Sequence, residues 1–72
     1  MNFLSKKVLD YQKKKLIEAE KNLQYYLSKK EQMEETTPDS KEIENQEKMI
    51  EIWNQNILKI KREIQKLEDK AK

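Results

Sequence analysis

Apolar residues recur with a period of seven through the second half of the chain, and this repeat constrains the fold more than any other feature. In a heptad, apolar residues at the first and fourth positions (a and d) form one stripe along an α-helix, whereas a strand would show a period of two. The segment is therefore predicted to be a long amphipathic helix. Position a holds Ile43, Ile50, Ile57, Ile64 and Ala71, and position d holds Gln46, Trp53, Ile60 and Leu67.

The first half of the chain carries the same pattern with more polar exceptions. It predicts another amphipathic helix of similar length. Val8 and Leu27 flank the stripe, and we expect them to widen it. Position a holds Leu9, Leu16, Leu23 and Lys30, and position d holds Gln12, Ala19, Tyr26 and Met33.

A single proline, Pro38, separates the two repeats. Proline disfavours helical backbone in the residue before it and suits the first turn of a helix after it. We therefore predict helices over about 3–34 and 39–70, joined by a turn over about 35–38. A chain of this length forms one domain, which spans 1–72.

Two residues are candidates for the N-cap of the second helix. Thr37 could cap it with Pro38 next, or Asp39 could cap it with Glu42 three residues on as a capping box. Asp39, Glu42 and Glu44 in either case crowd the helix start, where the helix dipole favours negative charge.

A short turn between two helices of equal length predicts an antiparallel hairpin, in which a positions face d positions. Folding the chain about Pro38 makes the numbers of paired residues sum to about 76. The fold class is therefore all-α: an antiparallel, coiled-coil-like hairpin, which we expect to dimerise into a four-helix bundle. The predicted layers are Met33/Ile43, Lys30/Gln46, Tyr26/Ile50, Leu23/Trp53, Ala19/Ile57, Leu16/Ile60, Gln12/Ile64 and Leu9/Leu67.

The composition agrees with long helices but leaves disorder as the competing interpretation. Charged residues make up 42% of the chain and hydrophobic residues 35%, with no Gly. Low hydrophobicity and high charge also describe unfolded chains. The net charge of only +2 and the sustained heptads favour the folded hairpin.

The inventory of chemically reactive groups argues against an enzyme. The chain has no His and no Cys, so the usual general base, thiol nucleophile and transition-metal ligands are absent. Without Gly it has no phosphate-binding loop of the common types. The acidic residues around the turn do not have the spacing of a calcium loop, and a solvated acidic turn explains them better. We expect no catalytic residue, no metal, no cofactor and no small-molecule substrate.

Charge is distributed unevenly along the chain. Residues 1–30 carry eight Lys against three acidic residues, residues 31–51 two Lys against eight, and residues 52–72 six Lys and Arg against three. A hairpin therefore has a basic pole at its termini and an acidic pole at its turn. The basic pole supports the alternative function of a nucleic-acid-binding accessory protein, and Tyr11 could stack on a base. Its phosphate contacts would be Lys6, Lys7, Lys13, Lys14, Lys15, Lys59, Lys61, Arg62 and Lys66.

Several large apolar residues lie off the stripe, which points to an additional binding surface. Trp53 is the only Trp, and at a d position it is larger than a two-helix seam needs. It either fills the core opposite Leu23 or serves as an interface anchor, a role in which Trp and Tyr are over-represented. The interface candidates are Met49, Ile52, Trp53, Tyr11, Tyr25 and Leu4.

The leading functional prediction is a protein–protein interaction module that forms a homodimer or docks on another protein. Its role would be that of a small scaffold, adaptor or inhibitor, of the kind encoded by bacteria, phages and mobile elements. No apolar run approaches the length of a membrane span, and the N-terminal residues lack the apolar region of a secretory signal. We therefore expect a cytoplasmic protein without a membrane partner.

Overall fold

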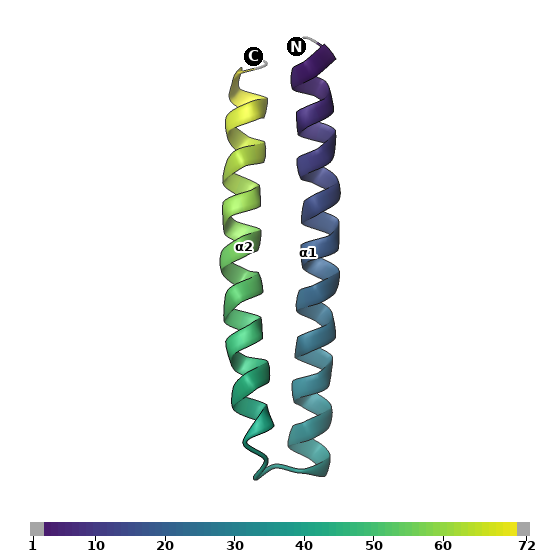
Figure 1. Cartoon of the computed structure of the whole chain (residues 1–72), viewed down its shortest axis with the longest axis vertical. Helices are drawn as coiled ribbons and strands as arrows, with labels where there is room; N and C mark the ends of the chain where they lie inside the picture. Colours follow the sequence, from purple (N-terminus) through teal and green to yellow (C-terminus); the bar gives the residue numbers. More distant parts are fainter. Residues whose placement is uncertain (1–2, 71–72) are drawn as a thin grey trace.

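The computed structural model describes residues 3–70 and is a two-helix hairpin (Figure 1). Helix α1 spans Phe3–Thr36 and helix α2 spans Glu42–Lys70, and the two pack side by side in opposite directions. Both regular elements of the described chain are helices, which confirms the all-α hairpin. The Cα atoms fill an envelope of 53 × 14 × 13 Å, with the turn at one pole and both described ends at the other.

The core is the single seam where the a and d stripes of the two helices meet. Every predicted a and d position within residues 3–70 is buried or half-buried. Ala71, the last a position, lies outside the described residues. The most buried apolar side chains are Leu9, Ala19, Ile57, Ile60 and Ile64, and Leu16, Leu23, Trp53 and Leu67 pack against them.

The expectation that Val8 and Leu27 widen the seam is wrong. Their side chains remain 46% and 38% exposed, and neither joins the core. Two helices bury only a narrow stripe, because a residue one position outside a or d points past the single neighbouring helix. A wider stripe would need a further helix to cover it.

The contacts across the seam fit the predicted register. The Lys30 Nζ atom lies 3.9 Å from Glu47 Oε1, one residue from the predicted Lys30/Gln46 layer. Farther from the turn, Asn22 and Trp53 line one groove together, again within one residue of numbers that sum to 76. Agreement at two levels shows that the helices do not slip relative to each other by a heptad.

The turn caps α2 with a residue that the sequence analysis did not select. The Ser40 N–H donates to the Thr37 carbonyl oxygen at 3.0 Å, which closes a β-turn with Pro38 in the position where its fixed φ is favourable. The Ser40 Oγ then accepts from the Glu42 N–H at 3.2 Å. Ser40 is therefore the N-cap, and both predicted caps, Thr37 and Asp39, are wrong because the β-turn contains these two residues.

Helix α1 continues two residues beyond its predicted end, and Thr36 and Thr37 donate hydrogen bonds to two of its last carbonyl groups. The Thr36 Oγ1 donates to the Gln32 carbonyl oxygen at 2.9 Å. The Thr37 N–H donates to the Met33 carbonyl oxygen at 2.7 Å, in the i to i−4 pattern of an α-helix. At the start of α2, Glu42 and Glu44 occupy the first turn as expected from the helix dipole.

Replacing Ser40 with Ala tests the cap. The substitution removes the acceptor for the Glu42 N–H and should lower the free energy of unfolding by about 0.5–2 kcal/mol, the usual cost of losing an N-cap. Asp39→Ala is the matched control and should cost less, since the Asp39 side chain does not cap the helix. Urea denaturation followed by circular dichroism gives both values. A larger loss for Asp39→Ala than for Ser40→Ala would contradict the assignment.

Candidate interaction surface

The two sides of the hairpin seam are not equivalent. The positions that flank the a/d stripe are e on one side and g on the other, and antiparallel packing brings the g positions of both helices to the same side. Every e position of the two helices is exposed. Four g residues are instead half-buried: Asn22 and Lys29 on α1, and Met49 and Asn56 on α2.

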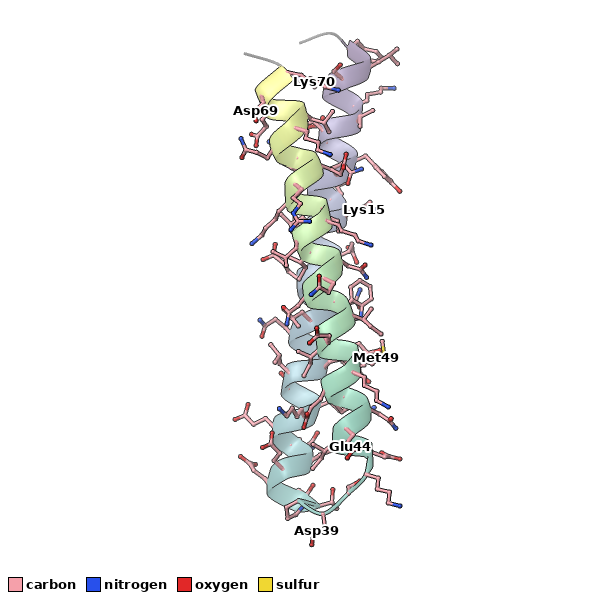
Figure 2. All side chains as sticks on the ribbon, turned by 90° about the vertical axis from the view of Figure 1, so that its left-hand side faces the viewer. Lys15, Asp39, Glu44, Met49, Asp69 and Lys70 are labelled. Carbon is pink, nitrogen blue, oxygen red and sulfur yellow. The ribbon has the colours of Figure 1, made fainter. Side chains whose placement is uncertain are left out.

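We call the g side of the hairpin, together with the neighbouring c positions, the groove face. Lys15 and Met49, at g positions of opposite helices, project from the same edge of the hairpin (Figure 2). The groove face consists of Leu4, Val8, Tyr11, Lys15, Glu18, Asn22, Tyr25, Lys29, Gln32 and Thr36 on α1, and of Glu42, Asn45, Met49, Ile52, Asn56, Lys59, Glu63, Lys66 and Lys70 on α2, with Trp53 bordering it from the seam.

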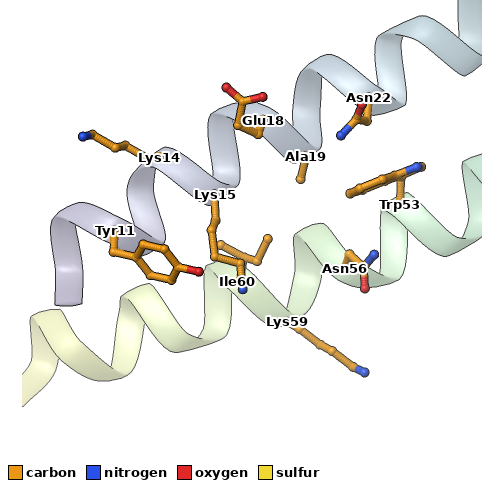
Figure 3. A pocket seen from close by; sticks show the side chains of 10 residues that line it. All are labelled: Tyr11, Lys14, Lys15, Glu18, Ala19, Asn22, Trp53, Asn56, Lys59 and Ile60. Atoms are coloured by element: carbon orange, nitrogen blue, oxygen red, sulfur yellow. The ribbon is translucent and has the colours of Figure 1, made fainter.

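A groove of about 560 Å³ lies at the centre of this face. Its floor is Ala19, which is only 2% exposed and whose small side chain leaves space beside the larger residues of the seam. The Trp53 ring lies beside Ala19 and Asn22, and the Tyr11 ring lies farther along, near Lys15 and Ile60 (Figure 3). The complete lining is Tyr11, Lys14, Lys15, Glu18, Ala19, Asn22, Trp53, Asn56, Lys59 and Ile60.

Trp53 belongs to both the seam and the groove. It packs against the buried core and is half-buried, so one part of the indole is covered by the hairpin itself. Its Nε1 atom is buried without a hydrogen-bond partner among the described residues. Tryptophan combines a large apolar area with a polar N–H, which suits the border between a core and an interface.

Lysine side chains cover the exposed aromatic rings of α1. The Lys15 Nζ lies 5.7 Å from the Tyr11 ring centroid, and the Lys29 Nζ lies 5.7 Å from the Tyr25 centroid. At the basic pole, the Lys7 Nζ lies 4.6 Å from the Phe3 centroid. Each pair is four residues apart, on one face of the helix. These cation–π contacts place a positive charge over each exposed ring.

The predicted interface residues fall into two groups. Tyr11 and Trp53 both line the central groove, with Tyr11 59% exposed. Leu4, Tyr25, Met49 and Ile52 do not line it, although they belong by helical position to the groove face. Tyr25 and Ile52 line separate shallow hollows, Tyr25 beside Lys29 and Ile52 among Glu44, Glu47, Lys48 and Glu51. Three groove residues were not among the predicted candidates: Asn22, Asn56 and Ala19. The g positions of the two asparagines and the small size of Ala19 at a d position were the available signals.

The predicted nucleic-acid contacts are all exposed and do not converge on one site. Lys14, Lys15 and Lys59 line the groove, whereas the other six lie elsewhere on the basic half of the hairpin. Lys66 pairs with Glu63 at 3.5 Å within α2, which partly neutralises that part of the surface.

No group of three or more His, Cys, Asp or Glu side chains within residues 3–70 is arranged to hold a metal ion. Neither described helix has a stretch that is both long and apolar enough to span a membrane. Comparison with known proteins gives no matching family model, no matching curated protein and no matching solved structure.

Two alanine substitutions test whether Tyr11 belongs to the groove face or to the core of the hairpin. Tyr11→Ala should change the free energy of unfolding of the single hairpin by less than about 1 kcal/mol, because the ring is mostly solvated. Leu9→Ala, only two residues away, removes a buried side chain and should cost about 2–5 kcal/mol. Thermal unfolding at low protein concentration measures both. Equal losses would show that Tyr11 belongs to the core of the hairpin.

Proposed function

We propose that this chain is a non-enzymatic protein–protein interaction module that associates through the groove face. The observation that carries the proposal is the asymmetry of the hairpin. On the g side, aromatic rings border a groove that reaches the core, whereas the hollows beside Ile17 and beside Ile52 are each lined by one aliphatic residue among charged or polar ones. Exposed apolar side chains that gather beside a groove are typical of binding surfaces.

We propose a homodimer, in which two hairpins form a four-helix bundle. Covering a large side chain completely contributes about 1.5–3 kcal/mol, and the side chains of this face are already partly covered. Even at a fraction of that value, five of them supply several kcal/mol, which offsets much of the entropy lost on association. The five are Tyr11, Tyr25, Met49, Ile52 and Trp53.

A dimer of this kind serves as a small scaffold, adaptor or inhibitor, because it presents long helical surfaces without a catalytic pocket. The single Arg among 16 basic residues and the wealth of Lys, Asn and Ile suit an AT-rich bacterial or phage genome. We place the chain among the small helical proteins that such genomes encode.

Two substitutions at matched exposure test the homodimer. Light scattering at micromolar concentration should give twice the chain mass of 8.8 kDa. Ile52→Glu places a charge on the groove face and should weaken association roughly tenfold or more, the equivalent of about 1.5 kcal/mol. Leu58→Glu is the control, since Leu58 is 47% exposed, close to the 50% of Ile52, but lies at a b position, about 120° around α2 from Ile52 and outside the groove face.

Trp53→Ala should also shift the equilibrium towards the monomer, as should Met49→Glu combined with Ile52→Glu. A parent chain that stays monomeric, with a melting temperature independent of concentration, would contradict the homodimer. If Ile52→Glu and Leu58→Glu weakened association equally, the groove face would not be the interface.

The basic half of the hairpin supports nucleic-acid binding as a second candidate. Here Tyr11 lies in one groove with Lys14, Lys15 and Lys59, an arrangement of a ring among positive charges that suits a single strand. Several features rank it below the first proposal: the lysines are spread over the surface, Lys15 covers its own tyrosine, and Lys66 pairs with Glu63.

Salt dependence tests this second candidate. Phosphate contacts release counterions, so we expect weak binding to single-stranded DNA or RNA at low salt that is lost near physiological ionic strength. Changing Lys13, Lys14 and Lys15 together to Glu should abolish it, as measured by fluorescence anisotropy. Tight binding that persists at about 0.15 M salt would place nucleic-acid binding first.

A further inference from the structure

The central groove lies at the midpoint of the hairpin. Helix α1 spans residues 3–36, so its middle is close to Ala19, and helix α2 spans residues 42–70, so its middle is Asn56. Both residues line the groove. A two-fold axis through a central groove brings two hairpins into contact over their whole length, whereas a groove near one pole would give only partial overlap.

The α1 side of the groove face repeats itself about this midpoint. Tyr11 with its covering Lys15 lies on one side, and Tyr25 with its covering Lys29 lies on the other. Reversing α1 about residue 20 exchanges position 11 with 29 and position 15 with 25. An antiparallel second copy would therefore place Tyr11 opposite Lys29 of the second copy and Lys15 opposite its Tyr25, so that each ring faces a lysine of the other pair. Residue 20 is also the level of Asn56 on α2, because paired numbers sum to 76.

Charge favours the same orientation. Within the described residues, the half with the chain ends (3–19 and 57–70) has ten basic against five acidic residues, a net charge of +5. The half with the turn (20–56) has five basic against nine acidic residues, a net charge of −4. Antiparallel stacking places unlike halves together, whereas parallel stacking places like halves together.

The area of the groove face favours two copies that overlap along their full length. The Cα envelope of the face, 53 Å by 14 Å, has a flat area of about 740 Å², of the same order as the accessible surface of about 800 Å² that each partner contributes to a stable interface. Two hairpins stacked along their full length therefore have an interface of ordinary size. A copy displaced by half the length would have about half that area.

From these four observations we propose that the occupant of the groove face is a second copy of this chain, antiparallel to the first, with the two-fold axis at the level of Asn56. The inference rests on the proposed homodimer and specifies its geometry. An axis that crosses the helices at right angles between the copies reverses their direction, so α1 packs on α1 of the second copy and α2 on α2.

This geometry gives the polar residues of the groove complementary partners. The two Asn56 side chains meet at the axis, and an amide can donate to and accept from its equivalent. Glu18 faces Asn22 of the second copy. Trp53 faces Lys59 of the second copy, whose aliphatic stem can cover the exposed part of the indole while its ammonium group stays in water.

Single cysteines test the arrangement, because the chain has none of its own. Asn56→Cys should form a disulfide between two copies under mild oxidation, which non-reducing electrophoresis detects. Gln55→Cys is the matched control: it is exposed on the outer face of α2 at the same level and should cross-link much less. Equal cross-linking of the two variants would overturn the proposal.

A spin label at Glu35→Cys provides a second measurement that leaves the groove face unchanged. Glu35 is exposed near the turn, about 15 residues from the proposed axis. At 1.5 Å per residue, two labels in the antiparallel dimer should be about 45 Å apart or more by electron–electron double resonance. A parallel dimer brings the two turns together and gives a much shorter distance.

The outcomes separate this inference from the proposed function. A dimer by light scattering with cross-linking at Asn56 and the long label distance supports both. A dimer with a short label distance, or without cross-linking at Asn56, overturns the antiparallel geometry and leaves the homodimer in place. A chain that remains monomeric overturns both.

Discussion

The burial of one narrow apolar seam determines most of this structure. Two helices provide each other with a single neighbour, so only the a and d stripes are shielded from water. Among residues 3–70, every side chain except that of Ala19 is at least 7% exposed. With no disulfide and no metal ligands of the usual kind, the hairpin depends on this seam for its stability. Residues one position outside the stripe therefore remain partly exposed to solvent. The groove face is a consequence of this geometry.

The sequence was sufficient to predict the features that follow from periodicity. The isoleucines of α2, seven residues apart, identified the helix and its buried stripe, and the fold about Pro38 identified the register that the Lys30–Glu47 ion pair supports. The N-cap was not predictable in this way, because Thr37, Asp39 and Ser40 are all good caps. The choice among them depends on whether Pro38 belongs to a turn or to the helix, which only the three-dimensional path decides.

The candidate site was predicted less completely, because a groove depends on small side chains that leave space as well as on large side chains that line it. Tyr11 was recognisable in the sequence as an aromatic residue off the seam, and Trp53 as a residue too large for it. The space between them comes from Ala19 and from the direction in which the indole ring turns, and neither is apparent from a heptad. Gln46 is a related case: it is 7% exposed with its Oε1 unpaired within the described residues, a local cost that periodicity alone does not explain.

The central claim is that the groove face is covered when two chains meet, and the single tryptophan reports on it directly. Trp53 borders the groove, so its accessibility to a quencher such as acrylamide should depend on association. Across a dilution series, we predict that quenching increases as dimers dissociate and approaches the value of the Met49→Glu, Ile52→Glu variant. Quenching that stays constant from the most concentrated to the most dilute sample would contradict the claim.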